Sequence, residues 1–112
     1  MDANQKTGSL MGNFVKQSPY DYEAVGASAT DQVLGSRGAQ GDYIDSLVIS
    51  VNTVATATVS IKDGAASIPI LTGGATVIPG VYTVKLGIGA VTGPWQVTTG
   101  AGATVLAIGL FT

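Results

Sequence analysis

An Asp-Gly pair between two alternating segments is the sequence feature that most constrains the fold. Residues 56–62 alternate polar and apolar side chains, which is typical of a strand with one face in water. Asp63-Gly64 follows directly, and this dipeptide favours the two-residue turn of a β-hairpin. The alternation resumes over residues 67–71, where Pro69 has no N–H to donate to a neighbouring strand. The second strand of this hairpin is therefore predicted to lie at a sheet edge or to carry a bulge.

Short segments rich in Val, Ile and Thr, separated by turns that contain Gly or Pro, continue along the chain. The other predicted strands cover residues 31–35, 42–51, 82–88, 94–98 and 103–111. The sets predicted to share a face are Leu47, Ile49 and Val51, then Tyr82, Val84, Leu86 and Ile88, and then Trp95 and Val97. No helix start is followed by apolar residues at a spacing of 3.6. The pattern predicts an all-β protein, a single antiparallel β-sandwich or jelly-roll-like barrel.

The composition changes near Glu23. Five of the twelve charged residues lie within residues 1–23, and this segment has no sustained period of 2 or 3.6. We therefore predict an extended N-terminal arm over residues 1–23 and a β-sandwich domain over residues 24–112. Twenty fully extended residues span at most about 70 Å, so the arm is long enough to reach a neighbouring subunit.

The residue types that carry most enzyme chemistry are missing or isolated. The sequence has no cysteine and no histidine, which removes the usual thiolate and imidazole groups of nucleophilic catalysis, base catalysis and metal binding. Asp42 and Asp45 are three residues apart and point to opposite faces of an extended strand, which does not suit a catalytic carboxylate pair. Asp63 lies in the predicted turn, where a carboxylate serves backbone hydrogen bonds. We expect no enzyme activity, no cofactor and no metal.

Charge and hydropathy argue against two further classes of partner. Only 11% of the residues are charged and the net charge is −2, so the chain lacks the basic stripe that neutralises phosphate backbones. The polar start lacks the apolar region of a secretory signal, and no segment approaches the ~20 apolar residues of a membrane helix. We expect no nucleic-acid partner, no membrane partner and no Sec export.

The last predicted strand, residues 103–111, is apolar on both faces. One face carries Val105, Ala107, Gly109 and Phe111, and the other carries Thr104, Leu106, Ile108 and Leu110. A central strand that is buried on both sides accounts for this pattern. Burial against another subunit also accounts for it, and residues 86–112 contain no charge to keep such a surface in water. We favour the second interpretation and expect a homo-oligomer, with a trimer as the expected state.

Aromatic residues suggest a different kind of ligand, since planar rings can stack on sugars. Tyr20 and Tyr22 share a face in an extended chain, and Trp95 follows a Gly-Pro turn. Because Trp95 is in phase with Val97 and large aromatic side chains dominate core packing, we expect Trp95 to be structural. Tyr20 and Tyr22 are then expected to anchor the arm. A glycan- or receptor-binding module of a phage fibre or cell-surface protein is the alternative function.

Four segments together resemble small virion proteins of tailed bacteriophages, namely capsid decoration (cement) proteins and head-fibre-like β-sandwich proteins. They are residues 29–35 (ATDQVLG), 38–44 (GAQGDYI), 58–64 (TVSIKDG) and 93–102 (GPWQVTTGAG). The resemblance implies a structural protein on the capsid surface that bridges major capsid proteins, often as a trimer. It also implies assembly in the host cytoplasm, and it brings no catalytic motif. The candidate protein-contact residues come from the arm and from the last strand. They are Phe14, Val15, Tyr20, Tyr22, Leu106, Ile108 and Leu110.

The composition change near Glu23 predicts that the arm contributes to docking and little to folding. Deleting residues 1–19 should leave the thermal unfolding transition nearly unchanged while it weakens binding to capsids. Differential scanning calorimetry and co-sedimentation with capsids measure the two effects separately. An unfolded truncated chain would show that the arm belongs to the core and that the proposed boundary is wrong.

Overall fold

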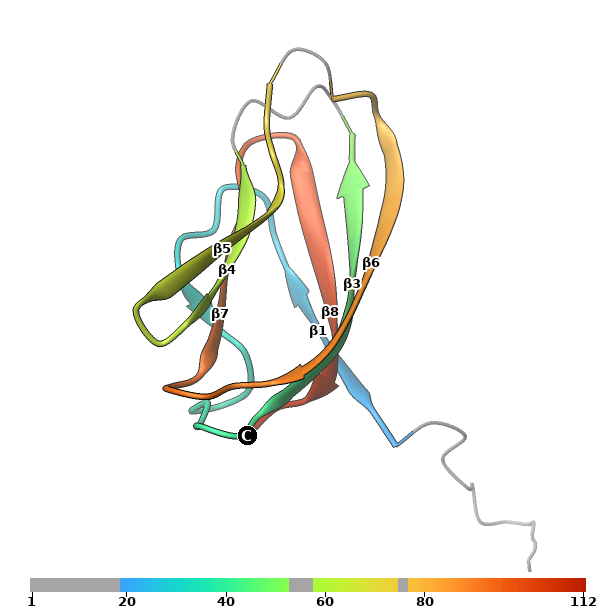
Figure 1. The fold of residues 1–112 in the computed structure, drawn as a ribbon. Coiled ribbons are helices and arrows are strands. Elements are labelled where there is room, and N and C mark those ends of the chain that lie inside the picture. Colours follow the sequence, from blue (N-terminus) through green and yellow to red (C-terminus); the bar gives the residue numbers. More distant parts are fainter. Residues whose placement is uncertain (1–18, 53–57, 75–76) are drawn as a thin grey trace, which may run out of the picture.

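The computed structural model describes residues 19–52, 58–74 and 77–112, which form eight strands (Figure 1). The strands are β1 (Asp21–Val25), β2 (Gln32–Val33), β3 (Tyr43–Val51), β4 (Val59–Asp63), β5 (Ala66–Leu71), β6 (Gly80–Gly89), β7 (Trp95–Thr98) and β8 (Ala103–Leu110). Within these described ranges, no helix is present that could cross a membrane. The arrangement confirms the predicted all-β class.

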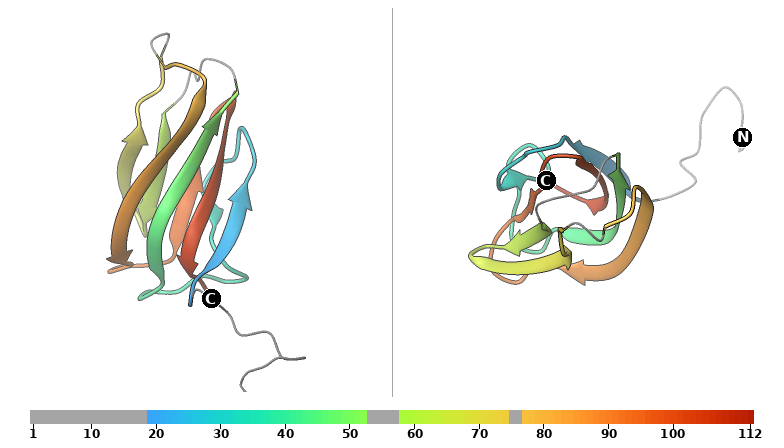
Figure 2. Two further views of the ribbon diagram at one scale, coloured as in Figure 1. Left: turned by 90° about the vertical axis from the view of Figure 1, so that its right-hand side faces the viewer. Right: turned by 90° about the horizontal axis from the view of Figure 1, so that it is seen from above.

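The strands form two antiparallel sheets that pack face to face (Figure 2). One sheet has the order β1-β8-β3-β6 and the other has the order β2-β7-β4-β5. Strands whose numbers add to nine are neighbours: β1 and β8, β2 and β7, β3 and β6, and β4 and β5. The further pairs β3–β8 and β4–β7 complete the sheets. This is the connectivity of a jelly roll, in which one long antiparallel ribbon is folded into a sandwich.

The hairpin predicted from the sequence is confirmed, but its two turn residues are Gly64 and Ala65, since Asp63 still belongs to β4 and pairs with Ala66. β4 ends at Asp63 and β5 begins at Ala66, and Gly64 takes the positive φ of 61° that the turn requires. β5 is an edge strand of its sheet, and its register against β4 shifts between Val59 and Ser60, next to Pro69. Both features predicted from this proline are therefore present. The first two residues of the predicted strand, 56–57, lie outside the described residues.

The N-terminal arm lies mostly outside the described residues, and so do Phe14 and Val15. The sandwich itself begins earlier than the composition change suggested. Asp21 to Glu23, assigned to the arm from the sequence, are the first three residues of β1 and pair with β8. Composition did not reveal this because the strand carries two carboxylates, which are uncommon in strands.

The core lies between the two sheets and contains the inward-facing residues of both. Its large, fully buried side chains are Val25, Leu34, Ile44, Leu47, Ile49, Val59, Ile61, Trp95 and Val97. The predicted shared faces of β3 and β7 are thus confirmed. Trp95 is 1% exposed, and its indole N–H donates to the Asp42 carbonyl at 2.9 Å, so its one polar atom is satisfied inside the core.

The predicted alternation fails near the end of β6. Tyr82, Val84 and Leu86 pack against the core as expected, but Ile88 is 39% exposed. The strand takes a φ of +66° at Gly87, and its register against β3 shifts at this point. A bulge of this kind interrupts the period of two, which the sequence alternation alone cannot reveal.

Replacing Trp95 with Ala should lower the free energy of unfolding by about 3–5 kcal/mol, because the variant loses a large buried side chain and leaves a cavity. That is a large part of the ~5–15 kcal/mol that stabilises a small domain. Chemical denaturation measures the change, with Tyr22→Ala as the matched control, since Tyr22 is 73% exposed. Equal stability of the two variants would contradict the assignment of Trp95 to the core.

Candidate interaction surface

The outer side of the β1-β8-β3-β6 sheet brings apolar side chains together from three strands. The register places Tyr22 of β1 opposite Ile108 of β8, and Ala24 opposite Leu106. Leu106 also lies opposite Val48 of β3. Residues directly opposite each other in an antiparallel pair point to the same face, so these side chains form adjacent cross-strand rows.

We call this surface the apolar face and define it as Tyr22, Ala24, Val48, Leu106, Ile108 and Leu110. Tyr22 is 73% exposed and Leu110 is 45% exposed, while Val48, Leu106 and Ile108 are half-buried. On the inner side of the same strand, Val105 and Ala107 are buried. β8 therefore lies centrally in its sheet but is covered on one side only, and the interpretation of a strand buried on both sides is wrong for the described chain.

Tyr20 packs at the end of the apolar face where the arm joins the sandwich. Its ring lies 5.5 Å from the ring of Tyr43, with a tilt of 35° between the planes. Tyr20 precedes β1 and Tyr43 begins β3, so their contact crosses the end of β8, which lies between these strands. The aromatic pair extends the apolar surface toward the start of β1.

One ion pair borders the apolar face on its β6 side. The Lys85 ammonium donates to Asp45 Oδ1 at 2.7 Å. This hydrogen bond holds the pKa of Asp45 below its ordinary value and raises the pKa of Lys85. The Lys85 side chain is 73% exposed whereas that of Asp45 is 12% exposed, so the pair belongs to the rim of the surface.

The outer side of the β2-β7-β4-β5 sheet has the opposite character. The register there places Ser60 opposite Thr98, and Lys62 opposite both Gln96 and Ser67. We call these five residues the polar face. The two broad surfaces of one sandwich thus differ in balance. The first carries the apolar face beside the polar residues Ser46, Ser50, Thr83, Thr104 and Lys85 on the same side of its sheet. The second carries mainly hydroxyl, amide and ammonium groups, with Val33 and Pro69 beside them.

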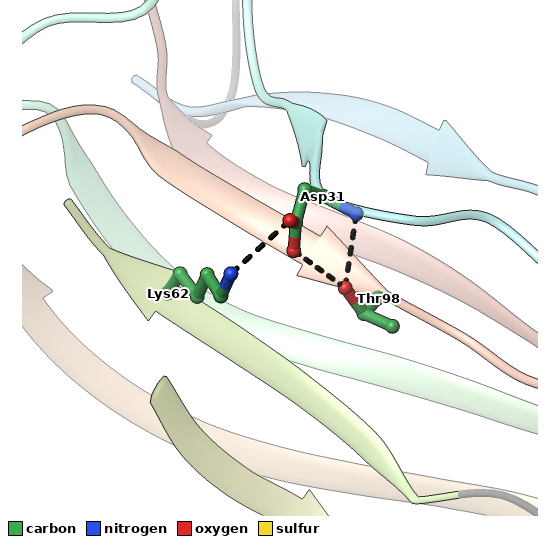
Figure 3. A network of polar contacts seen from close by, with 3 residues as sticks. All are labelled: Asp31, Lys62 and Thr98. Carbon is green, nitrogen blue, oxygen red and sulfur yellow. Dashed lines mark hydrogen bonds and ion pairs between the residues drawn. The ribbon is translucent and has the colours of Figure 1, made fainter. Parts of the chain in front are cut away.

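A small polar network fixes the centre of the polar face (Figure 3). Lys62 donates to Asp31 Oδ2 at 3.1 Å, and the Thr98 hydroxyl donates to Asp31 Oδ1 at 3.0 Å. The Asp31 backbone N–H donates in turn to Thr98 Oγ1 at 2.9 Å. Asp31 has a positive φ of 47°, a conformation that Asp tolerates better than most residues. The bonds from Lys62 and Thr98 lower the pKa of Asp31.

Other carboxylates also hold the chain together. Asp42 accepts bonds from the backbone N–H groups of Ala39 and Thr112, both at 3.1 Å. Asp63 accepts three backbone N–H bonds, of 2.9 to 3.2 Å, from residues 91–93 of the β6–β7 connection, and these lower its pKa. Local hydrogen bonding by Asp63 was predicted, but its partners lie about thirty residues away along the chain.

Five of the seven candidate contact residues are thus placed, and four of them share the apolar face: Tyr22, Leu106, Ile108 and Leu110. Tyr20 lies at its border. Sequence reasoning missed Val48, Ala24 and Tyr43. Val48 had a detectable signal, since it is apolar on the side of its strand opposite Leu47 and Ile49. Trp95 is buried and contributes nothing to any outer surface.

Comparisons with known proteins do not identify the chain. No protein-family model matches the sequence, and the searches of curated proteins and of solved structures returned no match. Among the described residues there is no pocket and no group of three His, Cys, Asp or Glu side chains able to hold a metal ion. The apolar face is the strongest candidate site that these residues offer.

The Asp45–Lys85 pair predicts a specific titration. Replacing Lys85 with Met should raise the pKa of Asp45, because the hydrogen bond from the ammonium is the largest cause of its lowered value. A carboxyl group with a lowered pKa stabilises the folded state above its unfolded pKa, and this contribution is lost as the pH falls through the folded value. The native pair should therefore lose its effect in acid.

Carbon-13 NMR of the side-chain carboxyl groups measures this titration. Lys62→Met is the matched control, since it should raise the pKa of Asp31 and leave that of Asp45 unchanged. An Asp45 pKa that does not move in Lys85→Met would show that the pair does not form in solution.

Proposed function

We propose that this protein is a non-enzymatic structural protein that docks on other protein chains through its apolar face. In line with the resemblance noted above, we propose that it decorates and stabilises a phage capsid by bridging major capsid proteins. The observation that carries the proposal is the contrast between the apolar face and the polar face of one sandwich.

Burial of the apolar face would supply the binding energy. Removing apolar surface from water contributes about 25 cal/mol per Å², before the entropic costs of association. Tyr22 and Leu110 are the most exposed of its large side chains and would gain most from contact. Tyrosine is among the residues enriched in binding hot spots. We propose that the polar face, with its Lys62 and Gln96, then remains in water.

The kind of partner follows from the charge of the surface. Asp45 and Lys85 neutralise each other at the rim, and the apolar face itself carries no charged side chain. A partner that is itself a folded protein with an apolar patch suits this surface better than a polyanion does. Many copies on a regular shell would gain avidity, so each contact can be modest in area.

The N-terminal arm would add a second contact in this proposal. Tyr20 lies at the border of the apolar face, so the preceding residues start beside the docking surface. Phe14 and Val15 are only six and five positions before it in the sequence. The sequence therefore supplies apolar side chains within reach of the same partner.

Glycan binding is the second candidate, and the exposure of Tyr22 favours it. An exposed aromatic ring beside a second aromatic pair, Tyr20 and Tyr43, is a surface on which a sugar could stack. Trp95 takes no part in this alternative because it is buried.

Introducing two charges on the apolar face should abolish docking without unfolding the protein. The double variant Tyr22→Asp and Leu110→Asp changes two exposed side chains, so its melting temperature should stay near that of the parent. Its affinity for purified capsids of the phage should fall roughly 30-fold or more, about 2 kcal/mol. Co-sedimentation at increasing protein concentration gives the affinity.

Val91→Asp is the matched control, because Val91 is 72% exposed but lies outside both sheets. The control should bind capsids as the parent does. Full capsid binding by the double variant would exclude the apolar face as the docking surface. Loss of binding on a glycan array, with capsid binding unchanged, would favour the alternative function.

A further inference from the structure

The four sheet edges of the sandwich are protected to different degrees. β1 and β6 form the edges of one sheet, and β2 and β5 form the edges of the other. An open edge exposes unpaired N–H and C=O groups that can pair with another chain. β2 has two residues, and β5 carries Pro69 together with a register shift. Both edges of this second sheet are thus short or interrupted.

The β1 edge is tied to the opposite sheet. The Glu23 carboxylate accepts a bond from the Gly35 N–H at 2.7 Å and another from the Gln32 side chain at 3.0 Å. Glu23 thereby links β1 to β2 and to the residues just after it. This side of the sandwich is closed by hydrogen bonds and carries a charge on its edge strand.

The remaining edge strand, β6, is less protected than these three. The strand is ten residues long, and its pairing with β3 is regular from Gly80 to Lys85 before the register shifts. The first five residues, Gly80–Val84, contain no charge, no proline and no bulge. We call these five residues the β6 edge. Val81 is 67% exposed, and Ile78, just before the strand, is 72% exposed.

The core is also incompletely covered beside this edge. Tyr82 and Val84 point inward and pack against the core, yet both remain half-buried. On the facing edge strand, Ile68 is 38% exposed. A strand added beside β6 would extend the hydrogen-bonded sheet and would also cover the open side of Tyr82 and Val84.

We propose that the β6 edge pairs antiparallel with the β6 edge of a second copy of this chain about a twofold axis. Only an extended backbone can satisfy the ladder of an edge strand. Among the described residues, β6 pairs on one side only, so a second copy offers the same unmet pairing and the same inward apolar residues. Joining the two edges meets both requirements in one self-complementary contact. The result is a continuous eight-stranded sheet with both apolar faces on one side.

Side-chain direction and charge both fit this pairing. Opposed residues of an antiparallel pair share a face, which keeps inward residues beside inward residues when Tyr82 lies opposite Tyr82 of the second copy. Val81 then lies opposite Thr83, and Gly80 lies opposite Val84. The two Lys85 side chains are kept about 20 Å apart along the strands, beyond the range of strong repulsion in physiological salt.

Amide hydrogen exchange of the full chain tests the proposal directly. In an edge strand, successive N–H groups alternate between the neighbouring strand and the solvent. Pairing with a second copy should therefore protect every amide from Val81 to Val84, in a particle of twice the 11.2 kDa chain mass by analytical ultracentrifugation. Diluting the protein to monomer should restore exchange at every second residue only.

Three results would overturn the proposal. One is a monomer at all concentrations with alternating protection. Another is an oligomer that keeps the alternation, which would show that the copies meet through a different surface, such as the apolar face. The third is continuous protection in a particle of monomer mass, which would show that another part of the same chain fills the edge.

A substitution provides the second test. Thr83→Lys places a charge at the centre of the β6 edge, where the residues at this position in the two copies would be diagonal neighbours about 7–8 Å apart. The dimer dissociation constant should rise at least tenfold, while the melting temperature of the monomer stays unchanged. Ala66→Lys is the matched control, since it puts the same charge on the exposed edge strand β5 and should leave the dissociation constant unchanged. An unaltered dimer in Thr83→Lys would contradict the β6 contact.

Discussion

A sandwich of two sheets has one interior, and a strand that is apolar on both sides can bury only one of them there. β8 is such a strand. Its inner residues Val105 and Ala107 lie in the core, and its outer residues Leu106 and Ile108 form the centre of the apolar face. Because β8 lies between β1 and β3, neighbouring strands cannot cover that outer side. The proposed docking function depends on this constraint.

Gly109 shows how closely β8 approaches its neighbour β3. A Cβ atom at this position would overlap the Tyr43 carbonyl oxygen of β3. The close approach leaves no room to turn the strand or to shift its register by one residue, which would exchange its two faces. The close approach to β3 at Gly109 therefore helps to fix the register that places these apolar residues on the outer side.

The few carboxylates of the chain largely serve to connect distant segments. Asp42 holds Thr112, Asp63 holds the connection between β6 and β7, and Glu23 joins β1 to the segment after β2. Each accepts backbone N–H groups that the connections between strands leave unpaired. This use of charge accounts for acidic residues in a chain that has little need of catalytic groups for the proposed function.

Local patterns predicted much of this fold. The β4–β5 hairpin with Gly64 in its turn, the edge position of Pro69, and the burial of Trp95 beside Val97 all follow from residues that are close together in the sequence. The strand order does not, because β1 meets β8 only after the whole chain has folded back on itself.

The apolar face, like the fold, was predictable only where local sequence patterns determine it. The outer apolar residues of β8 could be identified from alternation, and Tyr22 could be identified because it shares a face with Tyr20 in an extended chain. Alternation also marks Val48 as an outward apolar residue, but only the register places Val48 and Ala24 beside Leu106. The bulge at Gly87 also lay beyond local alternation, and Ile88, which follows it, is 39% exposed.

Carbene footprinting of the free protein and of the protein bound to capsids tests the central claim most directly, because it reports contact at individual side chains. The account predicts that labelling of Tyr22, Leu106, Ile108 and Leu110 falls on binding, while labelling of Ser60, Gln96 and Thr98 stays the same. Protection of the polar face, with Tyr22 and Leu110 labelled as in the free protein, would contradict it.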